Sequence, residues 1–112
     1  DFLVANGIAN LVMLSGDAHM LAADDGSNNV FTSDGAGPGF PVFHAAALDR
    51  PGAVKGGPYS EGAYPGGGQF GLLTVTDAGG AVTVRFSGRN WEDEELVSYE
   101  FTAPASNSPA PR

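Results

Sequence analysis

A chain of 112 residues is long enough for one domain of ordinary size and too short for two, so we expect a single hydrophobic core. The 17 glycines and 8 prolines, beside a hydrophobic fraction of 42%, indicate a folded domain rich in loops, not collagen or a disordered chain. A formal net charge of -8 with five Lys and Arg residues argues against a nucleic-acid-binding patch, and the lack of cysteine excludes disulfides and Cys-ligated zinc from this chain.

The apolar runs are far shorter than a membrane span, so no membrane span is predicted. The acidic start at Asp1 also lacks the basic region of a signal peptide. Because the first residue is not Met, we expect the sequence to be a piece of a longer chain.

Residues 1–5 have the character of the last turns of a helix. Asn6-Gly7 is a pair suited to a left-handed C-cap, with Leu3 and Ile8 placed for the hydrophobic contact that accompanies such a cap.

The stretch NLVMLSGDAHM (10–20) then contains an apolar run, Leu11 to Leu14, that stops at Gly16. Four large apolar residues without alternation predict a strand buried on both faces. Asp17 and His19 follow its carboxyl end, where a carboxylate and an imidazole two residues apart suit a short metal-binding turn. The alternative is that Asp17 caps backbone amides in a turn and His19 is a half-buried surface residue.

Residues 20–36 begin with helix-tolerant residues and then become polar, and we interpret Asp24 and Asp25 as part of a solvated turn. The run FPVFHAAA (40–47) predicts a short strand that starts at Pro41. His44, inside this run, is either a satisfied core histidine or a ligand or proton shuttle.

Residues 49–69 form the longest stretch without periodicity and hold the densest glycine of the chain. The interleaved aromatic and charged residues favour a functional loop over a flexible linker, although Tyr59 and Tyr64 could equally cover a core. The stretch lacks the G-x-x-x-x-G-K-[ST] pattern of a phosphate-binding P-loop.

From residue 70 to about 102 the hydrophobic period is two, which predicts an antiparallel three-stranded meander. The turn at 77–80 closes a hairpin, and the polar loop SGRNWEDEE (87–95) leads to a third strand with Val97, Tyr99 and Phe101 on one face. Within that loop we expect Trp91 to be a packing anchor and residues 92–95 to be a solvated acidic run. The Pro- and Ser-rich end, 104–112, is expected to be a disordered tail.

Taken in order, the stretches 10–20, 39–62, 65–77 and 81–90 resemble the C-terminal part of PhoD-like (alkaline phosphatase D) proteins of the calcineurin-like metallophosphoesterase superfamily. The most specific element is the succession of apolar strand, Gly-Asp-x-His turn, glycine-rich loop and meander. The resemblance implies an α/β (α+β) fold, mostly β in this fragment, in which residues 1–103 are the C-terminal half of a two-sheet sandwich flanked by helices. Family habit further implies export from the cytoplasm.

The resemblance also implies that Asp17 and His19 are ligands of Fe, Ca, Zn or Mn ions that generate a hydroxide to hydrolyse a phosphate mono- or diester substrate. His44 and the loop Gly56 to Gly68 are candidates for the rim of that active site. The family's earlier ligand motifs and its Cys ligand are absent from this sequence. We therefore expect the remainder of the parent chain to be a partner, and this piece alone to bind metal weakly and to be inactive.

Two other hypotheses stay open. The chain could be a non-catalytic β-rich accessory module whose Gly/Tyr-rich loop binds a partner, with Gly-Asp-x-His only a turn. It could also be a truncated or degenerate gene product.

Overall fold

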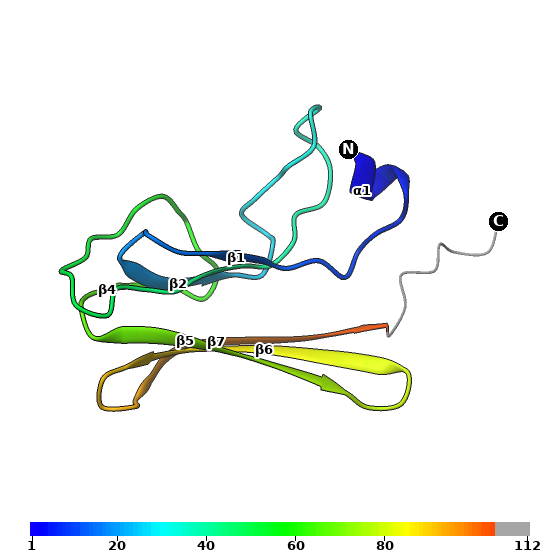
Figure 1. Ribbon diagram of the computed structural model, residues 1–112. Helices are drawn as coiled ribbons and strands as arrows, with labels where there is room; N and C mark the ends of the chain where they lie inside the picture. The colour runs from blue at the N-terminus through cyan, green and yellow to red at the C-terminus, as the bar shows by residue number, and fades with distance from the viewer. Residues whose placement is uncertain (105–112) are drawn as a thin grey trace.

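The computed structural model describes residues 1–104, and these form two stacked β-sheets with one short helix beside them (Figure 1). In chain order the elements are α1 (Phe2–Ala5), β1 (Met13–Ser15), β2 (Met20–Asp24), β3 (Val42–His44), β4 (Ala63–Pro65), β5 (Gln69–Asp77), β6 (Ala81–Asn90) and β7 (Glu95–Pro104). The first sheet has the strand order β1-β3-β2-β4 and the second has the order β5-β6-β7. The predicted β-rich fold with an antiparallel meander near residues 70–102 is confirmed.

Helix α1 ends as its sequence predicts. Gly7 has a φ of 65°, its N–H donates to the Val4 carbonyl at 3.1 Å, and the Ile8 N–H donates to the Leu3 carbonyl at 2.9 Å. These two bonds are the pair that defines a Schellman cap. Leu3 and Ile8 are both half-buried and line the same apolar hollow, as the capping motif requires.

The first sheet differs from the sequence prediction in which strand is buried. The apolar run at 11–14 yields only the short strand β1, which lies at the edge of the sheet and leaves Leu14 59% exposed, so the prediction that this run is buried on both faces is wrong. The fully buried strand is β2, between β3 and β4. Its sequence MLAAD tolerates helix and strand alike, so its pairing partners decide its conformation.

The second sheet is the predicted meander. Gly79 and Gly80 have positive φ angles of 61° and 106° in the β5–β6 turn, and the Ala78 N–H donates to the Ala81 carbonyl at 3.0 Å. Strand β6 continues to Asn90, so the expected polar loop is shortened to residues 91–94 because residues 87–90 stay paired. A register shift between Gly88 and Arg89 marks a bulge in the pairing of β6 with β7.

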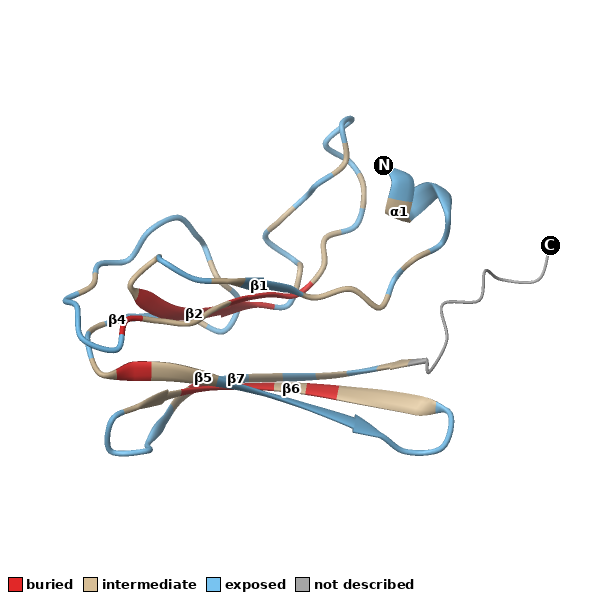
Figure 2. Cartoon of the chain, in the orientation of Figure 1, coloured by how far each residue is buried: buried red, intermediate tan, exposed pale blue. Residues whose placement is uncertain are grey.

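The core lies between the two sheets, where the buried segments of both face each other (Figure 2). Phe43 of β3 stacks on Phe86 of β6 with ring centroids 4.7 Å apart, and Leu21 and Val97 are buried in the same cluster. Gly88 permits this approach, since a Cβ there would lie 2.6 Å from Val97 Cγ1. Each large buried side chain contributes about 1.5–3 kcal/mol through burial.

The prediction that Trp91 is a packing anchor is wrong. Trp91 is 74% exposed and is not a packing anchor of the core. Its ring instead lies against Gly68, where an added Cβ would be 2.9 Å from Trp91 Cδ1. The acidic residues 92–95 are exposed as expected.

The predicted disordered tail, 104–112, falls outside the described residues from position 105 onward. Among residues 1–104, no helix has the length and apolar character needed to cross a membrane.

Candidate metal-binding turn between strands β1 and β2

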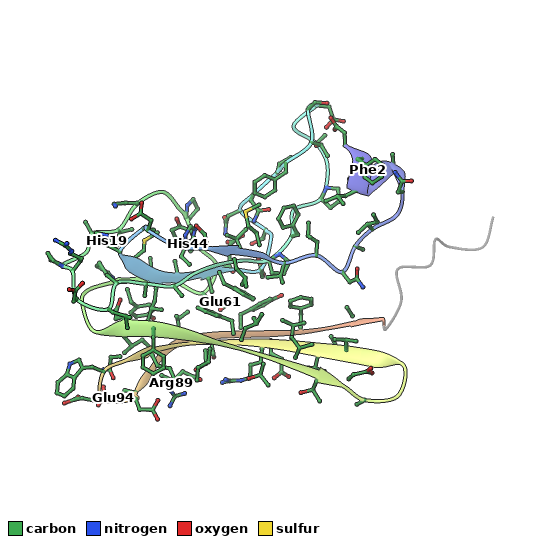
Figure 3. The ribbon with its side chains drawn as sticks, in the orientation of Figure 1. Phe2, His19, His44, Glu61, Arg89 and Glu94 are labelled. Carbon is green, nitrogen blue, oxygen red and sulfur yellow. The ribbon has the colours of Figure 1, made fainter. Side chains whose placement is uncertain are left out.

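The turn at residues 16–19 crosses one edge of the first sheet. Strands β1 and β3 are parallel and end together, with Ser15 paired to His44, while β2 starts beyond the turn and runs antiparallel on the other side of β3. The turn therefore passes the carboxyl end of β3, and Asp17, His19 and His44 are all placed toward this edge of the sheet. Figure 3 shows His19 and His44 in the same half of the sheet.

Asp17 and His19 are neighbours in this turn. His19 Nε2 lies 3.7 Å from Asp17 Oδ1, with the carboxylate fully exposed and 35% of the imidazole side chain exposed. The backbones of Asp17 and His19 lie in the left-handed region, with φ angles of 61° and 56°. Asp and His tolerate this region better than most residues, yet each non-Gly residue in it costs about 1–2 kcal/mol. Backbone strain of this kind concentrates at functional sites.

The tautomer of His19 is set by the loop that follows β3. His19 Nδ1 lies 3.3 Å from the carbonyl oxygen of Pro51, and a carbonyl can only accept a hydrogen bond. A hydrogen bond across this contact requires the proton on Nδ1, and in the neutral ring this leaves the lone pair of Nε2 on the side of Asp17. A backbone carbonyl in this position is the usual outer partner of a metal-binding histidine.

The pair satisfies part of what a metal ion requires. Two ligands about 2.1 Å from one tetrahedral ion lie about 3.4 Å apart, close to the 3.7 Å between His19 Nε2 and Asp17 Oδ1. Within residues 1–104, however, no group of three or more His, Cys, Asp or Glu side chains could hold a metal ion. The turn can thus supply two ligands of a site, but catalytic zinc sites typically use three protein ligands.

The glycine-rich loop packs directly on the turn and is not a free linker. A Cβ at Gly52 would lie 1.8 Å from the carbonyl oxygen of His19 and 2.9 Å from the Gly66 amide nitrogen, so only glycine fits between them. The same loop contains β4, which pairs with β2. Its contact with both the backbone and the ring of His19 fixes that residue in place.

His44 lies beneath this loop as a half-buried histidine. Its ring meets Tyr59 edge-on with centroids 5.5 Å apart, and among the described residues its Nδ1 is buried without a hydrogen-bond partner. Burial lowers the pKa of His44 below its ordinary value of 6.5, so the ring is neutral at pH 7. No hydrogen bond or ion pair within residues 1–104 joins it to Asp17 or His19.

Tyr59 covers the outer face of the sheet and Tyr64 is partly exposed. The Tyr59 hydroxyl donates to the Lys55 carbonyl at 2.6 Å, and burial, together with the charge of Asp24, raises its pKa. Tyr64 is 39% exposed. Of the two tyrosines, Tyr59 matches the covering role considered from the sequence.

Asp24 is the polar residue that the sequence prediction placed wrongly. It is 2% exposed, and its carboxylate accepts hydrogen bonds from Gly26, Asn28, Asn29 and the Ser60 N–H. Burial alone would raise the pKa of Asp24, but these donors lower it below 3.8. The two asparagines in DDGSNN are the local signal for such a network, whereas the Ser60 contact arises only in the folded chain. Asp25 is exposed, as predicted.

The comparisons with known proteins add no relative. No protein-family model matches the chain, and no curated protein or solved structure matches it either. The geometry of the turn and the motifs of the sequence are therefore the basis for assigning a function.

Proposed function

We propose that this chain is the C-terminal part of a metal-dependent, PhoD-like phosphoesterase in which Asp17 and His19 supply two ligands to the metal centre. The observation that carries the proposal is the pairing of an exposed carboxylate with an imidazole whose Nδ1 is bonded to the Pro51 carbonyl. This arrangement leaves Asp17 Oδ1 and His19 Nε2 as adjacent donor atoms.

The donor set limits the ions and defines the role of each residue. A carboxylate oxygen with an imidazole nitrogen suits Fe, Zn or Mn and is compatible with Ca. When bound, such a metal polarises a phosphoester and supplies a hydroxide at neutral pH. Asp17 contributes negative charge, and His19 contributes a neutral donor held in position by Pro51 and Gly52.

Exposed apolar residues next to the turn support a contact with the rest of the parent protein, which would supply further metal ligands. Met13 and Leu14 of β1 are exposed, and Leu14 lines an apolar hollow between the sheets together with Leu72 and Leu73. Apolar surface of this kind marks a contact with another protein segment. We propose that the parent packs here and brings the further metal ligands.

The ligand assignment is tested in the full-length parent. Asp17→Asn and His19→Ala should each lower metal content and phosphatase activity together, while Asp77→Asn, which changes an exposed carboxylate at the β5–β6 hairpin, should lower neither. Metal analysis and turnover with a phosphomonoester and a phosphodiester give both quantities. Full metal occupancy in both ligand variants would count against the assignment.

The isolated 112 residues provide a second test. With two ligands they should bind metal weakly and show no turnover. Phosphatase activity of the isolated chain that is abolished by Asp17→Ala would contradict this expectation.

A non-catalytic binding module is the second candidate, and one observation favours it. Leu48 and Trp91 are exposed; the Trp91 ring lies against Gly68, and the Gly68 N–H donates to the backbone carbonyl of Leu48 at 2.8 Å. Two large exposed apolar side chains beside one loop suit a protein-binding surface. The sequence upstream of this chain separates the candidates: Asp-x-His and Gly-Asn-His/Asp motifs favour the enzyme, and an unrelated domain favours the module.

A further inference from the structure

In this acidic chain, only some of the positively charged side chains that the structure describes are paired with carboxylates. Of its five Lys and Arg residues, two are engaged on the outer face of the second sheet: Arg85 donates to Glu95 at 2.8 Å, and Arg89 donates to Asp93 at 2.6 Å. Arg112 lies outside the described residues. Within residues 1–104, Lys55 makes no ion pair, and the one ion pair of Arg50 is a 3.9 Å contact with Asp49.

Both of these residues lie in the loop that packs on the candidate metal-binding turn. Arg50 directly precedes Pro51, whose carbonyl oxygen lies 3.3 Å from His19 Nδ1. The Lys55 N–H lies 3.4 Å from Met20 Sδ, next in the chain to His19. These two backbone contacts place the chain positions of Arg50 and Lys55 beside the segment His19-Met20.

The guanidinium of Arg50 is free to bind a ligand. Its Nε lies 3.9 Å from Asp49 Oδ1, at the outer limit of an ion pair, and the Arg50 side chain is 73% exposed. Exposed pairs of this kind contribute about 0–1 kcal/mol, so Asp49 competes weakly for the guanidinium. Arg50 therefore keeps the planar fork of donors that matches two phosphoryl oxygens.

We infer that Arg50 binds the phosphoryl oxygens of the phosphoester whose metal centre includes Asp17 and His19, and that Lys55 adds electrostatic attraction. This inference rests on the proposed function and names the group that recognises the anionic part of the substrate. A net charge of -8 repels phosphate from the chain as a whole, so the two available cations beside the turn define where an anion is attracted.

The test uses the whole 112-residue chain, with inorganic phosphate and substoichiometric Mn²⁺ as probes. Backbone amide NMR reports the two sites separately: Mn²⁺ broadens amides near a bound ion, and a phosphate titration at constant ionic strength shifts the amides of residues 49–56. The variants are Arg50→Ala, Arg50→Lys and Asp17→Ala. Arg112→Ala is the control that removes the same charge elsewhere in the chain.

The expected result is Mn²⁺ broadening of residues 16–20 in the unsubstituted 112-residue chain and in both Arg50 variants, and its loss in Asp17→Ala. Phosphate should bind about tenfold more weakly to Arg50→Ala, because a charge-assisted bidentate contact is lost. Binding to Arg50→Lys should be intermediate, since lysine keeps the charge without the fork. Arg112→Ala should bind phosphate as tightly as the unsubstituted 112-residue chain does.

Two contrary results have different meanings. Unchanged phosphate binding in Arg50→Ala, with Mn²⁺ still broadening the turn, overturns the inference and leaves the proposed function standing. Absence of even weak Mn²⁺ broadening at residues 16–20 in the unsubstituted 112-residue chain overturns the ligand pair on which the proposed function rests, and the inference falls with it. Equal weakening in Arg112→Ala and Arg50→Ala would show an effect of net charge and would also overturn the inference.

Discussion

The buried carboxylate of Asp24 should be a major determinant of stability. Five hydrogen bonds of 2.7–3.2 Å converge on it, from the amides of Gly26, Asn28 and Ser60 and from the side chains of Asn28 and Asn29. The Ser60 bond links the end of β2 to the glycine-rich loop, 36 residues later. Asp24→Asn keeps the shape of the side chain but turns an NH2 group toward donors that then have no acceptor.

The expected loss for Asp24→Asn is about 3–5 kcal/mol, since breaking a buried charged network leaves its partners unsatisfied. This is a large share of the roughly 5–15 kcal/mol that stabilises a typical domain. Urea unfolding followed by circular dichroism measures the difference. Asp25→Asn is the matched control: Asp25 is the exposed neighbour that accepts the Ser27 N–H, and its substitution should cost about 0.5 kcal/mol or less.

The same network predicts a pH dependence. Because the folded-state pKa of Asp24 lies below the ordinary 3.8, its contribution is complete above pH 3.8 and is lost as the pH falls through the folded-state value. The difference in free energy of unfolding between the unsubstituted 112-residue chain and Asp24→Asn should therefore be constant above about pH 5 and should shrink in acid. A loss no larger than that of Asp25→Asn, or a difference that grows in acid, would refute the reasoning.

Three further predictions concern the turn, the core and His44 of β3. Asp17→Gly should leave the free energy of unfolding unchanged or raise it by up to about 1 kcal/mol, because glycine adopts the φ of 61° without a Cβ penalty. The same variant should lose the Mn²⁺ broadening of the turn. Clear destabilisation in urea would argue against backbone strain at residue 17. Gly71→Ala should cost about 1–3 kcal/mol, since the new Cβ would lie 2.8 Å from Phe86 Cε2, whereas Gly16→Ala, with one neighbouring atom at 3.9 Å, should be nearly neutral. His44 should titrate below pH 6.5 by NMR, and the stability tied to its neutral form should be lost as the pH falls through the folded-state pKa; a midpoint above 6.5 would contradict its burial.

Much of the candidate site was visible in the sequence, but its environment was not. The Gly-Asp-x-His pattern identifies Asp17 and His19 and places them after a strand, and the structure confirms this order. No local pattern indicates that Pro51 fixes the His19 tautomer or that Gly52 packs on its carbonyl, because these contacts join positions more than 30 residues apart. The positions of Arg50 and Lys55 beside the turn follow from the same packing.

The sequence by itself determined the features that depend on neighbouring residues. Asn6-Gly7 ends α1 because glycine accepts the left-handed C-cap, and the alternation of residues 70–102 around the turn at 77–80 produces the meander. Only the tertiary structure decided that β2 is the buried strand, that β1 is an exposed edge and that Asp24 lies beneath the glycine-rich loop. The physical reason is that a short apolar run has the same local preference at the edge or centre of a sheet, and partners distant in sequence decide between the two.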